Sequence, residues 1–177
     1  MGLKLIERIF EQCMLIELVT RDDVRGNMEI SYNEDDLKEI TGGFSVKGHR
    51  IYRMPHKHTF FGIHFQKGSF PQSKLVSVLQ GSAMDFVVDL RRDSVTYRQS
   101  RCIELCGSKP TAVYIPAGFG HAFLSLEDDT VQLFSVNEYF RGELTGVINC
   151  KDPSIGLKLP FENIIMSEKD RQAGYLE

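Results

Sequence analysis

The chain contains 177 residues, which is the size of one ordinary domain. Its 21 basic and 24 acidic side chains give a formal net charge of -3. This balance excludes the strongly basic surface of a nucleic-acid-binding protein and a polybasic patch that would hold the chain at a membrane. We therefore expect one domain over residues 1–177 whose partners are small molecules or other proteins.

The amino-terminal segment and the cysteines indicate where the protein works. Charged side chains interrupt the apolar residues throughout positions 1–18, so we expect neither a signal peptide nor a membrane span there. The four cysteines are scattered and form no C-x-x-C pair; they are Cys13, Cys102, Cys106 and Cys150. This pattern is typical of reduced, buried thiols. The sequence thus predicts a soluble, cytoplasmic protein.

A short acidic segment predicts a helix over residues 33–40. Asn33 suits the N-cap position, because its side chain can accept a hydrogen bond from the first turn. Residues 34–36 place three acids at the positive end of the helix dipole. Gly42 and Gly43 then end the helix.

From residue 44 onward, runs rich in Val, Ile, Phe and Tyr alternate with turn signals such as Lys67–Ser69 and Gln80–Ser82. The clearest strand candidates are residues 74–79, 83–90, 101–105, 112–115, 122–126 and 131–136. Short strands at regular spacing predict an antiparallel sandwich or barrel. Residues 150–177 are less regular, and we expect them to wrap around the barrel.

The segment Phe60–Gln66 is an apolar strand with a histidine inside it. Because alternate residues of a strand point the same way, Gly62, His64 and Gln66 are predicted on one face, and larger apolar side chains, including Phe61, on the other. Small and polar residues on a common face suit the wall of a cavity better than a dry core.

The string Ile115–Phe123 contains the pattern P-x-G-x-x-H, formed by Pro116, Gly118 and His121. Proline and glycine favour a tight turn that delivers His121 to the start of the next strand. The pattern resembles the second motif of the cupins, a superfamily of jelly-roll proteins, in which it places a histidine at the mouth of the barrel.

Three interpretations of the five histidines are open at this point. In the first, each histidine is a surface residue or a hydrogen-bonded core residue. In the second, His56, His58 and His121 bind a metal ion. Residues 59–63 lack the carboxylate that the first cupin motif would add, which disfavours this interpretation.

In the third interpretation, His64 acts as a base without a metal ion. A carboxylate such as Asp170 would hold its other ring nitrogen, and a cation such as Lys74 would stabilise developing negative charge. Spacing alone does not choose among the three interpretations.

An ordered set of motifs makes the comparison specific. The motifs are Gly62–Gln66, Lys74–Gly81, Val87–Tyr97, Ile115–Phe123, Asp152–Gly156 and Ser167–Asp170. In their content and order, over the region from about Asp23 to Asp170, they resemble the dTDP-4-dehydrorhamnose 3,5-epimerase family. The resemblance implies an all-β, cupin-type jelly-roll barrel with short helical pieces. It also implies a homodimer that uses no metal or other cofactor and acts on a nucleotide-linked 4-keto-6-deoxy sugar.

The resemblance also implies the catalytic residues. His64 matches the family's base, and Asp170 matches its hydrogen-bonding partner. Lys74 matches the cation near the enolate oxygen. A ketone acidifies the neighbouring C–H bonds, so a base can form an enolate, and reprotonation from the opposite face inverts the carbon.

Further residues match substrate contacts of the family. Arg25 and Glu29 resemble residues that contact the nucleotide, often in the partner subunit's site. The remaining matches or expected contacts are Gln66, His121, Phe134, Tyr139, Phe140 and Lys169. Among these, His121 matches a second pocket histidine, Phe140 an aromatic that stacks on the base, and Lys169 a residue near the diphosphate.

Two departures from the family are expected to change the chemistry. Phe61 stands where the family has an arginine, and Phe134 aligns with the tyrosine that serves as the general acid. A phenyl ring cannot donate a proton, so Tyr139, Tyr114 or a water molecule would have to replace the acid. The segment 49–51 also departs from the family, and Arg50 or Arg53 would supply the charge lost at Phe61.

These observations predict a nucleotide-sugar epimerase. Loss of the acid should impair inversion more than proton abstraction, so we expect epimerisation restricted to C3, a keto-isomerisation, or proton exchange alone, ahead of full 3,5-epimerisation. One alternative is a non-catalytic cupin that binds a nucleotide sugar. The less favoured alternative is a metal-dependent cupin enzyme that uses His56, His58 and His121.

Overall fold

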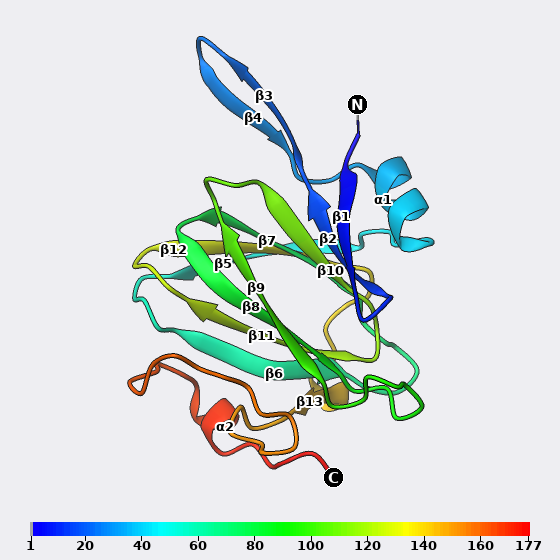
Figure 1. The fold of residues 1–177 in the computed structure, drawn as a ribbon, viewed down its shortest axis with the longest axis vertical. Helices are drawn as coiled ribbons and strands as arrows, with labels where there is room; N and C mark the ends of the chain where they lie inside the picture. The colour runs from blue at the N-terminus through cyan, green and yellow to red at the C-terminus, as the bar shows by residue number, and fades with distance from the viewer. Residues whose placement is uncertain (1) are drawn as a thin grey trace.

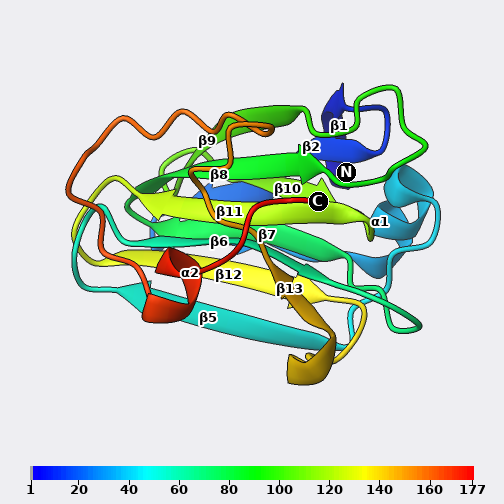
Figure 2. The same cartoon turned by 90° about the horizontal axis from the view of Figure 1, so that it is seen from below.

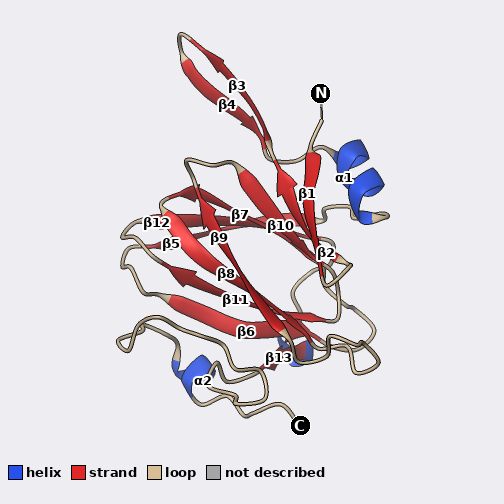
Figure 3. Ribbon diagram, viewed as in Figure 1, coloured by secondary structure: helices blue, strands red, loops and turns tan. Residues whose placement is uncertain are grey.

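The computed structural model describes residues 2–177, which form two antiparallel sheets and a separate hairpin (Figures 1 and 3). The larger sheet has the strand order β1 (Lys4–Ile9), β2 (Cys13–Glu17), β10 (Thr111–Ile115), β7 (Lys74–Gln80), β12 (Thr130–Val136) and β5 (Gly48–Met54). The smaller sheet has the order β13 (Thr145–Val147), β6 (Phe60–Gln66), β11 (Phe119–Ser125), β8 (Ser82–Asp89) and β9 (Ser100–Cys106). The hairpin consists of β3 (Val19–Asp23) and β4 (Gly26–Ile30).

The structure is all-β with short helices, and the prediction of a jelly roll is confirmed. The six strand candidates and the strand predicted over Phe60–Gln66 are all present, with boundaries that differ by three residues at most, at the start of β11. The predicted helix is also present as α1 (Glu34–Thr41), where the Asn33 side chain accepts a hydrogen bond from the N–H of Asp36. Gly42 ends α1 in the left-handed region with φ of 76°. Neither α1 nor any other helix of residues 2–177 is long and apolar enough to cross a membrane.

Three apolar clusters hold the layers together. One lies between the sheets and includes Val76, Val113 and Phe123. A second lies on the outer face of the larger sheet, where Leu37 of α1 packs. The third covers the outer face of the smaller sheet and receives apolar side chains from residues 157–176. Both faces of each sheet are therefore buried over part of their area, which explains why so many strands read as continuous apolar runs.

The carboxyl-terminal segment, residues 150–177, wraps along the smaller sheet, as expected, and ends near β13 and β6 (Figures 1 and 2). It is fixed by backbone hydrogen bonds: the N–H of Phe60 donates to the carbonyl of Ile165, and the N–H of Ile165 donates to the carbonyl of His58. The short helix α2 (Glu168–Arg171) follows, with Ser167 as its N-cap. This arrangement brings the end of the chain beside β6.

The pairing of β6 with β11 contains an irregularity that corrects the predicted faces of β6. His64 pairs with His121, but Phe61 pairs with Phe123, so three steps along β6 match two along β11. Phe61 and His64 consequently point into the same interior, and the prediction that Phe61 lies on the opposite face is wrong. A side chain at Gly62 would meet Ala122, since a Cβ atom there would lie 2.5 Å from the Ala122 Cβ.

Candidate active site

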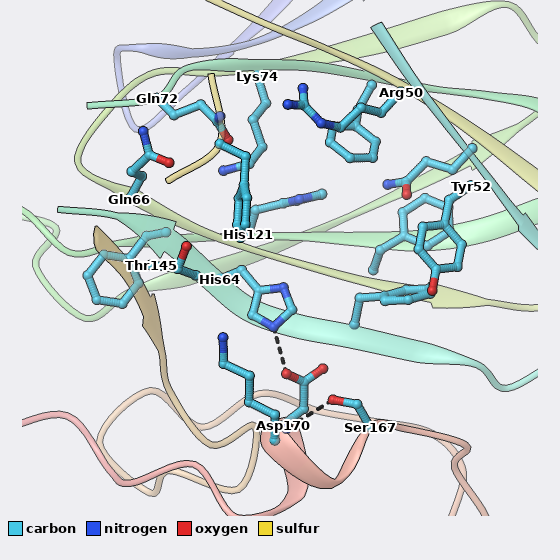
Figure 4. A pocket seen from close by; sticks show the side chains of 17 residues that line it. Arg50, Tyr52, His64, Gln66, Gln72, Lys74, His121, Thr145, Ser167 and Asp170 are labelled. Atoms are coloured by element: carbon cyan, nitrogen blue, oxygen red, sulfur yellow. Dashed lines mark hydrogen bonds and ion pairs between the residues drawn. The ribbon is translucent and has the colours of Figure 1, made fainter. Parts of the chain in front are cut away.

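A cavity of about 390 Å³ lies between the two sheets. The smaller sheet contributes His64 and Gln66 from β6 and His121 from β11, and the larger sheet contributes Lys74 from β7 (Figure 4). Five phenylalanines contribute to the remaining wall, and most of the cavity surface is apolar. A few convergent polar groups in an otherwise apolar cavity are typical of a site for a small molecule.

His64 and Asp170 form a hydrogen-bonded pair at the base of this cavity (Figure 4). The Nε2 atom of His64 lies 2.6 Å from Oδ1 of Asp170, although the residues are 106 positions apart in the chain. The wrap of the carboxyl-terminal segment produces this contact, because it places α2 under β6. The side chain of Ser167 accepts a hydrogen bond from the N–H of Asp170 and so fixes the start of α2.

The pair has a defined proton arrangement. A carboxylate can only accept, so the shared proton belongs to Nε2 of His64, and the lone pair of Nδ1 stays available to a ligand. Burial by itself would raise the pKa of Asp170, but hydrogen bonds from His64 and from the N–H of Gly62 outweigh burial and hold the pKa below its usual value. Asp170 is therefore ionised at neutral pH and can orient the imidazole.

A second pair lies deeper in the cavity. The Nε2 atom of His121 lies 2.7 Å from Oδ2 of Asp85, which is fully buried on β8. Asp85 was not predicted as a site residue; an acid in the middle of the largely apolar run 83–90 is the signal that would have found it. The pair gives His121 a fixed orientation toward the cavity.

Lys74 provides a buried positive charge next to these groups. Its side chain is 8% exposed, and burial lowers its pKa to about 8, although the negative charge of Asp85 acts in the opposite direction. At pH 7 the Lys74 side chain is therefore still mostly protonated. The cavity thus combines an imidazole that can accept a proton, His64, with a desolvated cation that can stabilise negative charge.

The opposite wall belongs to the larger sheet. Gln132 and Phe134 of β12 line the cavity, and so do Arg50 and Tyr52 of the neighbouring edge strand β5. Arg50 and Arg53 were both predicted as replacements for the charge lost at Phe61. Of the two, Arg50 lines the cavity, whereas Arg53 lies on the other face of β5, outside the lining. Tyr52 was not predicted as a site residue.

Some of the remaining predicted contact residues line the cavity, and others do not. Phe140 and Lys169 line the cavity, and Gln66 is held by the carbonyls of Phe70 and Tyr139, to which its Nε2 donates. The side chain of Tyr139 lies outside the lining and is exposed. The cavity's only tyrosine among residues 2–177 is Tyr52.

Arg25 and Glu29 lie away from this cavity, on the hairpin of β3 and β4 that projects from the body of the chain (Figure 1). Arg25 is exposed and forms an ion pair with Asp23, which raises the pKa of the guanidinium. Burial raises the pKa of Glu29.

The metal interpretation does not fit the geometry. His58 stacks on Phe161, with ring centroids 3.7 Å apart, and neither His56 nor His58 belongs to the cavity lining that contains His121. In the part of the chain that the structure describes, no three His, Cys, Asp or Glu side chains are grouped so that they would hold a metal ion. The interpretation in which His56, His58 and His121 are joint ligands is therefore wrong.

Known proteins resemble this chain along nearly its whole length. The sequence profile of the family described as dTDP-4-dehydrorhamnose 3,5-epimerase matches residues 7–177. A relative of that name from Methanothermobacter thermautotrophicus is 33% identical over 172 residues, which covers 95% of this chain and 91% of the relative. A dTDP-4-dehydro-6-deoxyglucose 3-epimerase from Streptomyces bikiniensis is 27% identical over 158 residues, covering 89% of this chain and 81% of the relative.

Solved structures agree with these sequence relationships. The dTDP-4-dehydrorhamnose 3,5-epimerase of Bacillus anthracis, with TDP and PPi bound, has a TM-score of 0.95 and 31% identity, and the match covers 99% of this chain and 100% of that one. A 3'-monoepimerase from Streptomyces bikiniensis in complex with dTDP-quinovose has a TM-score of 0.87 and 27% identity, over 93% and 84% of the two chains. By sequence, by fold and by the motifs that line its cavity, this chain belongs to the dTDP-4-dehydrorhamnose 3,5-epimerase family.

Proposed function

We propose that this protein is an isomerase that abstracts a proton next to the keto group of a dTDP-linked 4-keto-6-deoxyhexose. The observation that carries the proposal is the pairing of His64 with the buried Asp170, at 2.6 Å, in the cavity that also holds the desolvated Lys74. A base, its orienting carboxylate and a cation are the three groups that enolate formation requires.

In the first step, Nδ1 of His64 takes the proton from the carbon beside the ketone. The electron pair of the broken C–H bond moves to the ketone oxygen, where Lys74 stabilises the negative charge. Asp170 stabilises the imidazolium that forms, because it accepts the proton of Nε2 at short range. His121, held by Asp85, would hydrogen-bond the sugar.

The second step returns a proton to the carbon, and its stereochemistry depends on the group on the far side of the sugar. Phe134 of β12 lines the cavity at the position where the family has its general acid, and a phenyl ring has no proton to give. We therefore propose an activity narrower than 3,5-epimerisation: inversion at C3 alone, or a keto-isomerisation. The phosphates of the nucleotide would meet two cations of the lining, the half-buried Arg50 and the exposed Lys169.

Incubation with dTDP-4-keto-6-deoxyglucose in heavy water tests the proposal. We expect solvent deuterium to enter C3 of the sugar, as detected by loss of the corresponding proton NMR signal. The alternative, a cupin that binds nucleotide sugars without turnover, predicts saturable binding of dTDP with no deuterium at C3 or C5. That outcome would reject the enzymatic proposal for this substrate.

We also propose that the protein works as a homodimer in which Arg25 and Glu29 of one subunit reach the nucleotide in the other. The support is the projecting hairpin of β3 and β4, which carries the exposed apolar side chains Val24 and Met28. A two-stranded hairpin is marginally stable alone, so a partner surface would explain its composition. The reduced state of the four cysteines suits the cytoplasm, where we place the protein.

Mixed dimers test this arrangement. Arg25→Ala should weaken substrate binding about tenfold to a hundredfold, as expected for loss of a charge-assisted hydrogen bond. If Arg25 crosses to the partner, a mixture of Arg25→Ala and His64→Asn subunits, unfolded and refolded together, should regain exchange activity, because each mixed dimer contains one intact site. Absence of any gain over the separate variants, or a monomeric mass by light scattering, would show that Arg25 does not act across an interface.

A further inference from the structure

Both departures from the family lie against strand β5. The ring of Tyr52 contacts the ring of Phe61 edge to face, with centroids 4.3 Å apart and an interplanar angle of 65°. Arg50 is the residue of β5 that pairs with Phe134 of β12. A tyrosine thus lies beside the position where the family has an arginine, and an arginine lies beside the position where the family has a tyrosine.

Arg50 and Tyr52 reach the cavity together because they are two residues apart on one strand. The residues of β12 across from them, Phe134 and Gln132, line the same cavity. The replacements at Phe61 and Phe134 therefore leave the cavity with one arginine and one tyrosine, both supplied by β5.

From this placement we propose that Tyr52 is a catalytic residue: the proton donor that acts on the side of the sugar opposite His64. The inference rests on the proposed function. His64 belongs to β6 of the smaller sheet and Tyr52 to β5 of the larger sheet, so the two side chains enter the cavity from opposing walls (Figure 4). Inversion of a carbon requires a base and an acid on opposite faces, and these walls provide them.

The other tyrosines that sequence analysis considered are in the wrong places. Tyr114 packs on the outer face of the larger sheet against Phe44, with ring centroids 5.2 Å apart. Tyr139 is 60% exposed and lies outside the cavity lining. Tyr52 lines the cavity and can also exchange protons with water, since 47% of its surface is exposed.

The protons balance over one turnover. His64 takes one proton from the carbon, and the Tyr52 hydroxyl gives one to the same carbon from the other side, which leaves an imidazolium and a phenolate. Arg50, two positions earlier on the same face, stabilises the phenolate. Water then reprotonates the exposed Tyr52, and His64 releases its proton to water, so no other reactant is needed.

The variant Tyr52→Phe removes only the hydroxyl and keeps the ring that packs on Phe61. We expect the rate of inversion at C3 to fall about 10²- to 10⁴-fold, the usual contribution of a general acid. Wash-in of deuterium with retained configuration should continue, because His64 can return a solvent-derived proton to the face from which it took one. Proton NMR of the sugar in heavy water separates exchange with retention from exchange with inversion.

Two further variants complete the experiment. Tyr175→Phe alters an exposed tyrosine outside the cavity lining and should leave both rates unchanged. The double variant Tyr52→Phe with Phe134→Tyr restores a donor at the position where the family has one, and it should regain inversion by at least tenfold over Tyr52→Phe, since a general acid contributes well above that factor.

The outcomes separate the two proposals. Inversion by Tyr52→Phe at the wild-type rate, or wild-type exchange without any inversion, would overturn the role of Tyr52 while leaving proton abstraction by His64 in place. An equal fall in exchange and inversion would also overturn it, because a proton donor affects only the second step. Absence of exchange in the wild-type protein would overturn the proposed function and this inference together.

Discussion

Replacement of His64 by asparagine is expected to lower the rate of deuterium incorporation at C3 by about 10²- to 10⁴-fold, because the chain then has no base at the reacting carbon. Asparagine is polar and smaller than histidine, so the cavity keeps its shape and the affinity for dTDP should change little. Isothermal calorimetry with dTDP measures that affinity independently of turnover. His56→Asn, which changes an exposed histidine outside the cavity lining, should behave as wild type.

The variant Asp170→Asn should lose nearly as much activity, for a reason that the geometry supplies. The N–H of Gly62 donates to Oδ2 of Asp170, so an asparagine there would turn its carbonyl oxygen to Gly62 and its amide group to His64. Nε2 of His64 would then have to accept, and its proton would move to Nδ1, where the lone pair is needed. Exchange within tenfold of wild type for either variant would contradict the assignment of His64 as the base.

The strands could be predicted from the sequence because most of them are buried on both faces. Such strands read as apolar runs between turn residues, as residues 83–90 and 131–136 do. The helix α1 was equally visible, since Asn33 and Gly42 mark its two ends. The edge strands β1 and β5 were not predicted, because their exposed residues break the apolar pattern.

The residues of the candidate site were harder to predict from the sequence than the strands. Asp170 lies 106 residues from His64, and no spacing argument connects them; the order of motifs did so. Asp85 was overlooked because an acid in a largely apolar strand does not reveal which histidine it will meet. Tyr52 was overlooked because its strand was not predicted, so neither its face nor its partner Phe61 was known.

The wrong prediction for the faces of β6 has a local cause. Strict alternation put Phe61 and His64 on opposite faces of β6, but the irregular pairing with β11 turns both inward. A bulge changes the side-chain period for one step and leaves little trace in composition. Gly62 is the residue that the close approach of Ala122 requires.

Replacement of Lys74 by methionine is expected to stabilise the fold while it removes activity. Burial lowers the pKa of Lys74 to about 8, whereas an unfolded chain holds this side chain near its ordinary value of 10.5. Below pH 8 both states bind the proton, and the folded state carries the full cost of the buried charge, on the order of 3 kcal/mol. Methionine has similar length and no charge, so Lys74→Met should raise the free energy of unfolding at pH 7 by about 1 to 3 kcal/mol.

The contribution of Lys74 to folding stability increases, rather than decreases, as the pH becomes alkaline. Between pH 8 and pH 10.5 the folded wild-type protein releases the Lys74 proton before the unfolded chain does, so the contribution of Lys74 to stability rises with pH through this window. The advantage of Lys74→Met should therefore shrink and disappear by about pH 10.5, as measured by urea unfolding at several pH values. Lys158→Met, which alters an exposed lysine, should show no such dependence.

The pKa of Lys74 also sets the pH dependence of the reaction, which runs opposite to that of stability. Only the protonated Lys74 stabilises an enolate, so the exchange rate should fall as pH rises through about 8, and Lys74→Met should lose about 10²- to 10³-fold at pH 7. A variant that is both less stable at pH 7 and still active would refute the role of Lys74. If Lys74→Met instead gains stability and loses activity, the buried charge of Lys74 destabilises the folded protein and serves to stabilise the enolate.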